Sequence, residues 1–299
     1  MNKVISVENL SKSFKEKEVL KGISFDVHSR DCVALIGPNG AGKTVLMSCL
    51  LGDYLPTSGK IKILGKNGSD QSLKKEVGIL FQENVTQEKV KVKELLDFQK
   101  AIYSNPLNDN EIDDYLGFNQ EQKNQFAEKL SGGQRRLLSF VLVLIGQPDI
   151  IFLDEPTASM DTSTRKRFWE IINSLKAAGK TIIYSSHYIE EVEYTADRIL
   201  VLHDGQLLRD TTPYLLRTEE KEKVFTLPEK YLPIIENQNI TDLEIKFDTI
   251  SFSTKHVSAI WKVLADKNCP LEDIEMTNRT LLNSIFDSEK EEKADYENL

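Results

Sequence analysis

The 299-residue chain is poor in cysteine, and its three cysteines, Cys32, Cys49 and Cys269, are scattered and odd in number. Such a set excludes the disulfide framework of a small secreted domain and predicts free thiols in a reducing cytosol. Histidine is scarce too, and no His or Cys cluster has the spacing of a metal site. The 40% hydrophobic content is nevertheless ample for a large core and up to two domains.

Long apolar runs are also missing. The longest, residues 137–145, is ended by Gly146, Gln147 and Pro148, whereas a membrane span needs about 20 apolar residues. The N-terminus enters a predicted strand at once, which predicts that no signal peptide is present. Positive charge is in deficit, because the net charge is −9. A general nucleic-acid binder would show a basic face, so no nucleic-acid partner is expected.

A glycine-rich segment follows the apolar run Cys32–Ile36 and matches the phosphate-loop pattern G-x-x-x-x-G-K-[ST] without mismatch. The segment consists of Gly37, Pro38, Asn39, Gly40, Ala41, Gly42, Lys43 and Thr44. Its glycines let consecutive N–H groups point inward as an anion cradle. Lys43 is expected to reach the β- and γ-phosphates, and the Thr44 hydroxyl to ligate Mg²⁺. A buried strand before the segment and a helix over residues 45–51 support this interpretation over a chance match.

A carboxylate pair ends a second apolar run, Ile150–Leu153. Asp154 is expected to hold Mg²⁺ through its water shell, as in other phosphate-loop ATPases. Glu155 lies one residue further and points in a different direction, so we predict that it orients or deprotonates the attacking water. The alternative is an acidic pair that only caps a strand. The phosphate loop upstream favours the catalytic interpretation.

Two more polar residues follow apolar runs at predicted strand ends. Gln82 follows residues 77–81, and its neutral amide can touch both Mg²⁺ and the attacking water. His187 follows a strand predicted over residues 181–184, at the edge where α/β sheets place ligand contacts. Its imidazole can bind the γ-phosphate or position Glu155. Neither residue is informative alone, and their order among the other segments predicts the catalytic role.

The segment over residues 130–134 reads Leu-Ser-Gly-Gly-Gln and precedes an apolar helix. Ser131 is a good N-cap, and Gly132 and Gly133 expose backbone N–H groups. The segment is therefore a second anion-binding helix start, far in sequence from the first. A simple capped helix is the alternative.

Together these segments make the chain resemble the ATP-binding subunit of an ABC transporter over roughly residues 1–215. The resemblance implies an α/β phosphate-loop NTPase core with an antiparallel β subdomain and a helical subdomain, and ATP and Mg²⁺ as ligands. It also implies that two subunits pair head to tail around the nucleotide. The residues of one subunit that then face the ATP of the other are Ser131, Gly132, Gly133 and Gln134.

Two further residues are carried over from the resemblance. Asp161 matches a residue of the family's loop that crosses the dimer interface, and Phe14 matches the aromatic that stacks on adenine. Core packing is the alternative for Phe14. The departures from the family pattern are Val45 after the phosphate loop and Met160 in the interface loop, and neither removes a catalytic group.

The chain is predicted to divide into an ATP-binding domain over residues 1–216 and an α+β accessory domain over residues 224–287. Residues 1–30 are predicted to form short strands, and the helical subdomain to cover about residues 84–147. A charged linker is predicted over residues 217–223, and an acidic, disordered tail over residues 288–299. The accessory domain is expected to hold two strands around Asp248, a helix from Val257, a strand at Ile274 and a last helix over residues 281–286.

The expected function is an exporter ATPase, because the C-terminal segment loosely resembles the extension of bacterial drug-, antibiotic- and bacteriocin-exporting ABC ATPases. The resemblance implies a separate membrane permease, which residues 83–103 are expected to face. It also implies a second ATP-binding subunit, a homodimer being favoured over a heterodimer, and a cytoplasmic location on the inner face of the membrane. An importer ATPase and a soluble ABC ATPase are the alternatives, and the transported substrate stays open.

Overall fold

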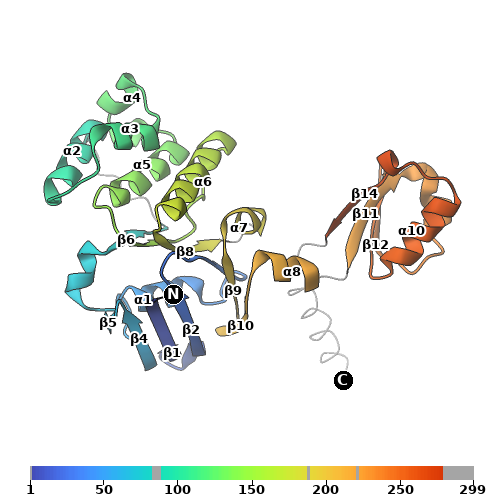
Figure 1. Ribbon diagram of the computed structural model, residues 1–299, viewed down its shortest axis with the longest axis horizontal. Helices are drawn as coiled ribbons and strands as arrows, with labels where there is room; N and C mark the ends of the chain where they lie inside the picture. The colour runs from blue at the N-terminus through green and yellow to red at the C-terminus, as the bar shows by residue number, and fades with distance from the viewer. Residues whose placement is uncertain (1, 83–88, 187–188, 220–221, 279–299) are drawn as a thin grey trace. The chain divides into compact units, whose positions relative to one another are not determined.

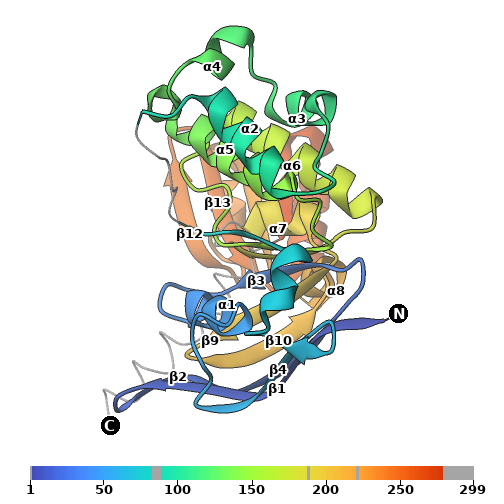
Figure 2. The same cartoon turned by 90° about the vertical axis from the view of Figure 1, so that its left-hand side faces the viewer.

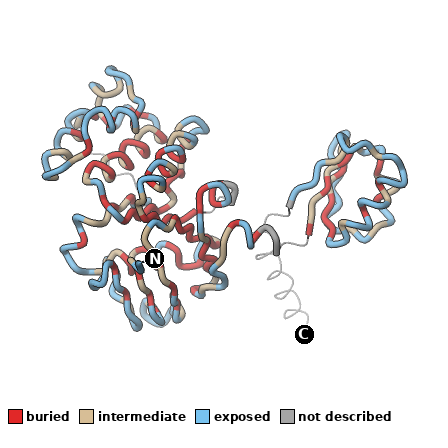
Figure 3. The backbone as a smooth tube through the Cα atoms, in the orientation of Figure 1, coloured by how far each residue is buried: buried red, intermediate tan, exposed pale blue. Residues whose placement is uncertain are grey.

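The computed structural model describes residues 2–82, 89–186, 189–219 and 222–278, and the chain divides into two compact units (Figure 1). They are Met1–Thr212 and Pro213–Leu299. Each unit buries a hydrophobic core of its own, which Figure 3 shows in red. None of the helices in the described part of the chain combines the length and the apolarity that crossing a bilayer requires.

The first unit is built on a six-stranded sheet with the order β10-β9-β3-β8-β7-β6. Its strands are β3 (Cys32–Ile36), β6 (Val77–Leu80), β7 (Ile150–Leu153), β8 (Thr181–Ser186), β9 (Arg198–His203) and β10 (Gln206–Thr211). All neighbours are parallel except β9 and β10. Every residue of β3 and β7 is buried, which is why these strands appear in the sequence as unbroken apolar runs. The four predicted parallel strands β3, β6, β7 and β8 are confirmed.

An antiparallel sheet with the order β2-β1-β4-β5 forms the β subdomain. Its strands are β1 (Lys3–Phe14), β2 (Lys17–His28), β4 (Ser58–Ile63) and β5 (Lys66–Asn67). The prediction of short strands before residue 30 was wrong, because β1 and β2 each have 12 residues. The β1–β2 pairing shifts register several times, and Asn9 has a φ of 46°. Such irregularities interrupt the alternation of side chains, so one long strand looks like several short ones.

Helices of the first unit gather beyond the β6 edge of the parallel sheet (Figures 1 and 2). They are α2 (Val92–Ile102), α3 (Asp109–Leu116), α4 (Gln120–Asn124) and α5 (Gly132–Leu144), with the short turn η2 (Ala127–Lys129). After β7, α6 (Thr162–Ala177) packs against the sheet, where Trp169 meets Tyr184 of β8 with ring centroids 5.4 Å apart. The short turn η1 (Gln71–Lys75) precedes β6. The rings of Phe140 on α5 and Phe168 on α6 lie 4.5 Å apart. Two more helices complete the unit, namely α1 (Lys43–Leu50) and α7 (Ile189–Thr195).

The second unit contains a four-stranded antiparallel sheet with the order β12-β13-β11-β14. Its elements are α8 (Pro213–Glu219), β11 (Lys223–Pro228), η3 (Glu229–Tyr231), α9 (Leu232–Ile235), β12 (Thr241–Lys246), β13 (Thr249–Thr254), α10 (Val257–Asp266), η4 (Leu271–Asp273) and β14 (Glu275–Asn278). The strands around Asp248, the helix from Val257 and the strand after Ile274 are confirmed. The predicted linker contains the end of α8 and the first residue of β11, which the sequence did not predict. The predicted helix over residues 281–286 and the tail lie outside the described residues.

Candidate functional site

The parallel strands bring most of the predicted site residues to one edge of the sheet. Strands β3, β8, β7 and β6 are consecutive neighbours with the same direction, so their carboxyl ends meet at the same edge. The phosphate loop follows β3, Gln82 lies just after β6, and the carboxylate pair follows β7. His187 comes directly after β8 and lies outside the described residues.

Glycine is required at two positions of the phosphate loop. Gly42 has a φ of 101°, which side chains with a Cβ rarely adopt, and it precedes the first residue of α1. At Gly37, a Cβ atom would lie 2.1 Å from the backbone oxygen of Leu202 on β9. The loop is therefore pressed against the sheet and turned sharply into α1, as a cradle for phosphate oxygens requires.

Lys43 is buried within the same loop. Its ammonium donates hydrogen bonds to the carbonyl oxygens of Gly37, at 2.8 Å, and Pro38, at 3.1 Å. Burial lowers the pKa of Lys43, and the nearby carboxylates of Glu155 and Asp154 act in the opposite direction. The cation and the two anions therefore share one site, although they come from segments more than 100 residues apart.

The carboxylate pair is held by Ser185 of β8, which the sequence analysis did not identify. The Ser185 hydroxyl donates to Asp154 Oδ1 at 2.5 Å and accepts the backbone N–H of Glu155 at 2.8 Å. Ser185 is fully buried and Asp154 is 8% exposed. One hydroxyl therefore fixes both residues of the pair at the end of the neighbouring strand.

Glu155 has an unusual backbone conformation. Its φ is 43°, in the left-handed region that costs a residue with a side chain roughly 1–3 kcal/mol. The Nε2 atom of Gln82 donates to Glu155 Oε2 at 3.3 Å. The structure thus brings together two side chains that were predicted to act on the same water.

The Leu-Ser-Gly-Gly-Gln segment begins α5 as predicted. The Ser131 hydroxyl accepts the N–H of Gln134 at 3.2 Å, and the Gln134 side chain accepts the N–H of Ser131 at 3.1 Å, which forms a capping box. Among the described residues, no hydrogen bond joins Ser131 or Gln134 to the phosphate loop.

The loop over residues 159–161 packs against this segment. A Cβ at Gly133 would lie 3.2 Å from the Cα of Met160 and 3.4 Å from Asp161 Oδ2. Asp161 caps α6 by accepting the N–H groups of Ser163, at 3.0 Å, and Thr164, at 2.9 Å. Hydrogen bonds from these two residues hold the pKa of Asp161 well below its usual range. The two segments that the resemblance assigns to a dimer interface are thus neighbours within one chain.

Phe14 lies at the end of β1 and is not a core residue. Its side chain is 40% exposed and meets Tyr54 edge to face, with ring centroids 5.2 Å apart. The Lys12 ammonium lies 4.9 Å from the Phe14 ring. This exposure removes the core-packing alternative for Phe14. Tyr54 was missed because it lies in an irregular segment after α1 and carries no local pattern.

Three predicted Mg²⁺ ligands offer oxygen donors, namely the Thr44 hydroxyl at the start of α1, the Gln82 amide and the Asp154 carboxylate. Oxygen is the ligand atom that Mg²⁺ prefers. Within residues 2–82, 89–186, 189–219 and 222–278, no group of three or more His, Cys, Asp or Glu side chains could hold a metal. This donor set fits an ion that shares its coordination with phosphate oxygens.

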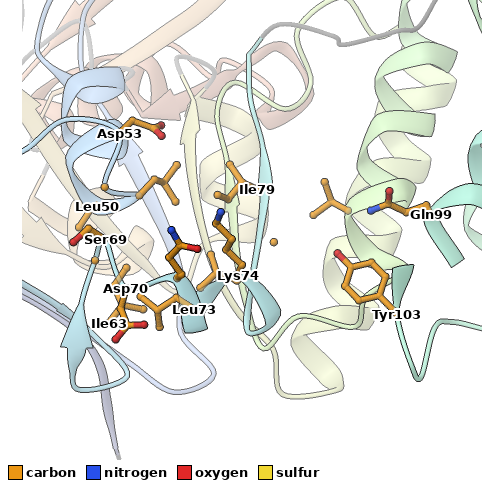
Figure 4. A pocket seen from close by; sticks show the side chains of 17 residues that line it. Leu50, Asp53, Ile63, Ser69, Asp70, Leu73, Lys74, Ile79, Gln99 and Tyr103 are labelled. Carbon is orange, nitrogen blue, oxygen red and sulfur yellow. The ribbon is translucent and has the colours of Figure 1, made fainter. Parts of the chain in front are cut away.

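A cavity of about 480 Å³ lies away from these residues, between the sheets and the helical region (Figure 4). Leu73 and Lys74 line it from η1, and Gln99 and Tyr103 line it from the α2 side. No residue of the phosphate loop or of the carboxylate pair lines this cavity. It is therefore a separate hollow of the first unit.

Comparisons with known proteins agree with this geometry. The sequence profile of the family described as ABC transporter matches residues 20–158. The chain is 37% identical to a Nod factor export ATP-binding protein I of Rhizobium sp. (strain N33), over 73% of this chain and 74% of that protein. It is 28% identical to the linearmycin resistance ATP-binding protein LnrL of Bacillus subtilis (strain 168), over 88% of this chain and 90% of that protein.

A solved structure of the ATP-binding subunit of an ABC transporter superimposes with a TM-score of 0.64, at 26% identity, and covers 72% of this chain and 92% of that one. The predicted fold, a phosphate-loop ATPase core with an antiparallel β subdomain and a helical subdomain, is thereby confirmed. The chain belongs to the ABC transporter family as an ATP-binding protein, and it is an ATPase.

Proposed function

We propose that this chain is the cytoplasmic ATPase of an exporter, that it dimerises around two MgATP, and that closure of the dimer drives a separate permease at the inner face of the membrane. The observation that carries the proposal is the Gln82–Glu155 contact of 3.3 Å beside the Asp154 carboxylate that Ser185 holds. This arrangement joins a water-activating carboxylate, an orienting amide and a metal-binding carboxylate at one strand edge.

In the proposed mechanism, Lys43 neutralises the β- and γ-phosphates. Thr44, Gln82 and Asp154 would hold Mg²⁺, which would stabilise negative charge on the phosphates. Glu155 accepts a proton from the attacking water, and Gln82 orients that water. His187, which follows β8, binds the γ-phosphate or positions Glu155. The Phe14 ring stacks on adenine beside Tyr54.

The second half of each site comes from the partner subunit in this proposal. Ser131 has its hydroxyl at the N-terminus of α5, a 13-residue helix whose dipole favours negative charge at this end. The backbone N–H groups of Gly132 and Gly133, with Gln134, complete this surface for the γ-phosphate of the partner's ATP. Asp161 lies beside it and crosses to the partner.

Export is favoured by the names of the relatives, one of which refers to Nod factor export and another to linearmycin resistance. The match to the second covers 88% of this chain, which is more than the first unit contains, so it extends into the second unit. We therefore propose a drug, antibiotic, peptide or lipid as the exported substrate. No comparable observation favours an importer or a soluble ATPase.

The permease is proposed to dock at the cavity beside α2. Phe98 and Ile102 lie one helical turn apart on α2 and are 65% and 58% exposed, next to the cavity residues Gln99 and Tyr103. An apolar segment of a partner would cover these side chains and fill the hollow. Replacing both Phe98 and Ile102 by Ser should abolish co-purification with a membrane protein from the native host without lowering the ATPase rate of the isolated chain.

The decisive experiment is size-exclusion chromatography with light scattering on Glu155→Gln, with and without MgATP. This variant should bind ATP without hydrolysing it, and MgATP should shift it from monomer to dimer. The double variant Lys43→Ala/Glu155→Gln is the control and should stay monomeric, because it lacks the phosphate-binding cation. Wild-type turnover in Glu155→Gln would reject Glu155 as the catalytic base. A monomer under both conditions would show that pairing needs the permease or a different cassette chain.

A further inference from the structure

Arg136 is a buried cation in the middle of the first unit. It lies on α5, five residues after Ser131, and is 1% exposed. Burial lowers its pKa to about 10, while the carboxylates of Asp154 and Glu155 act in the opposite direction, so the guanidinium stays charged at neutral pH. Burying a cation is expensive, and an apolar side chain of similar volume often serves stability as well. The position of Arg136 therefore suggests a role other than filling the core.

One side of the guanidinium binds the segment that carries Gln82. Its Nη1 atom donates to the carbonyl oxygen of Phe81 and to that of Gln82, the latter at 3.2 Å. These carbonyls follow β6 directly. The backbone that orients the Gln82 side chain is thus hydrogen-bonded to α5.

The other side binds the segment that carries Glu155. Nη2 donates to the carbonyl oxygens of Asp154, at 2.6 Å, and Glu155, at 3.3 Å, and Nε donates to that of Pro156 at 3.1 Å. Three successive carbonyls converge on one planar group, and the middle one belongs to Glu155 in its left-handed conformation. Arg136 thereby stabilises the strained turn that carries the Glu155 carboxylate.

Only a guanidinium suits both sides at once. Its donors lie in one rigid plane, whereas a Lys ammonium is a compact point charge on a flexible stem. The guanidinium joins two segments that are distant in sequence, since Gln82 and Glu155 are 73 residues apart. The Gln82 Nε2 and Glu155 Oε2 atoms nevertheless lie 3.3 Å from each other. A small shift of either segment would separate the amide from the carboxylate.

We propose that Arg136 is a positioning residue that sets Glu155 against Gln82 for ATP hydrolysis by clamping the backbone of both segments to α5. The inference rests on the proposed roles of Glu155 and Gln82. Because α5 begins at Ser131, about 7.5 Å along the helix axis from Arg136, the clamp also joins this chain's catalytic carboxylate to the segment that faces the partner's nucleotide.

The test compares Arg136→Lys and Arg136→Ala with wild type. Misplacement of a catalytic group by about 1 Å can cost about 100-fold in rate, so kcat of Arg136→Lys should fall by about that factor. Its KM for ATP and its affinity for MgATP should stay close to wild type, because Lys43 and the phosphate loop are untouched. Its melting temperature should fall, because a Lys ammonium cannot satisfy all five backbone carbonyls that Arg136 binds. Arg167→Lys is the matched control. Arg167 also donates to backbone carbonyls, those of Asp114 and Tyr115, but away from the site, so its kcat should not change.

Chemical rescue separates positioning from support of the fold. Removing the side chain in Arg136→Ala leaves a space next to the carbonyls, and millimolar guanidinium should restore part of the lost kcat there but not in Glu155→Gln. An unchanged kcat in Arg136→Lys would overturn the proposal. A loss of kcat in Arg136→Lys that accompanies lost ATP binding, without rescue of Arg136→Ala, would also overturn it, because Arg136 would then only support the fold.

The same experiment keeps the two proposals apart. If Glu155→Gln is inactive while Arg136→Lys turns over like wild type, the positioning proposal fails and the proposed function stands. If Glu155→Gln itself turns over like wild type, the proposed role of Glu155 fails, and with it the basis for positioning.

Discussion

Single residues of the site depend on partners from distant parts of the sequence. Glu155 occupies a left-handed conformation, and its N–H group is bound by Ser185, 30 residues away. The same hydroxyl donates to the buried Asp154 carboxylate. Without the Ser185 hydroxyl, the Asp154 carboxylate and the Glu155 N–H would each lose a hydrogen-bond partner.

Removing that hydroxyl should therefore affect catalysis as well as stability. Ser185→Ala should destabilise the fold by about 1–3 kcal/mol, because the buried Asp154 carboxylate and the part-buried Glu155 N–H each lose a hydrogen-bond partner. Its kcat should also fall by about tenfold, which corresponds to about 1.4 kcal/mol of transition-state stabilisation. Thermal unfolding and steady-state ATPase rates measure the two effects.

The matched control is Thr195→Val, which removes a buried hydroxyl that donates to the Glu191 carbonyl at 2.7 Å. It should lose a similar amount of stability while keeping its kcat. Equal losses of kcat in the two variants would contradict the special role of Ser185.

The reactivity of the three cysteine thiols also depends on how deeply each single residue is buried. Burial raises the pKa of Cys32 to about 12 and also raises that of Cys49. A raised pKa means less of the reactive thiolate at pH 8, so both thiols should resist iodoacetamide in the folded protein. Cys269 is half-buried and should react first. Mass spectrometry before and after denaturation measures this order, and a Cys269→Ser variant that still reacts quickly when folded would contradict it.

At the scale of elements, helix N-termini with the same local geometry have different proposed roles. Helices α3, α4 and α5 each begin with a capping box, at Asn108, Asn119 and Ser131. Of these three helices, only α5 follows the cap residue with two glycines, and the second, Gly133, packs against the loop over residues 159–161. The local geometry is shared, but the expected function is not.

Substitutions at two N-cap residues should therefore separate the effect of a cap on stability from its effect on ATPase activity. Ser131→Ala and Asn108→Ala should each destabilise the protein by about 1 kcal/mol, since each removes one N-cap hydrogen bond. Only Ser131→Ala should lower the ATPase rate, because only Ser131 is proposed to contact the partner's nucleotide. Denaturant unfolding and ATPase assays measure both. An equal rate loss in Asn108→Ala would show that the helical region, rather than the Ser131 hydroxyl, limits activity.

For the whole molecule, the two hydrophobic cores share no residue. The core of the first unit runs from β1 to β9, and that of the second is built on β11, β13 and α10. Each unit therefore has the buried apolar surface that independent folding requires. All the described residues of the candidate ATP site belong to the first unit.

A chain that ends at Thr212 should accordingly fold and bind MgATP with the affinity of the full chain. Nucleotide titration and thermal unfolding measure this, and adding Glu155→Gln to the shortened chain tests whether dimerisation needs the second unit. Loss of nucleotide binding would contradict the independence of the first unit. Retained binding with loss of the dimer would assign pairing to the second unit.

The family, the parallel strands and the phosphate loop could all be predicted from local patterns in the amino-acid sequence. These features depend on short local patterns, such as the apolar run Cys32–Ile36 before Gly37 or Ser131 at a helix start. Gln82 and Asp154 could be predicted because each lies at a strand end, where parallel strands converge.

The contacts that hold the site together could not be predicted, because they form only when the chain folds. Ser185 and Arg136 contact the Glu155 segment across 30 and 19 residues, and Arg136 reaches Phe81 across 55. Tyr54 meets Phe14 only because the chain returns to the end of β1. Such contacts leave no periodicity in the sequence, because they join groups that are neighbours in space alone.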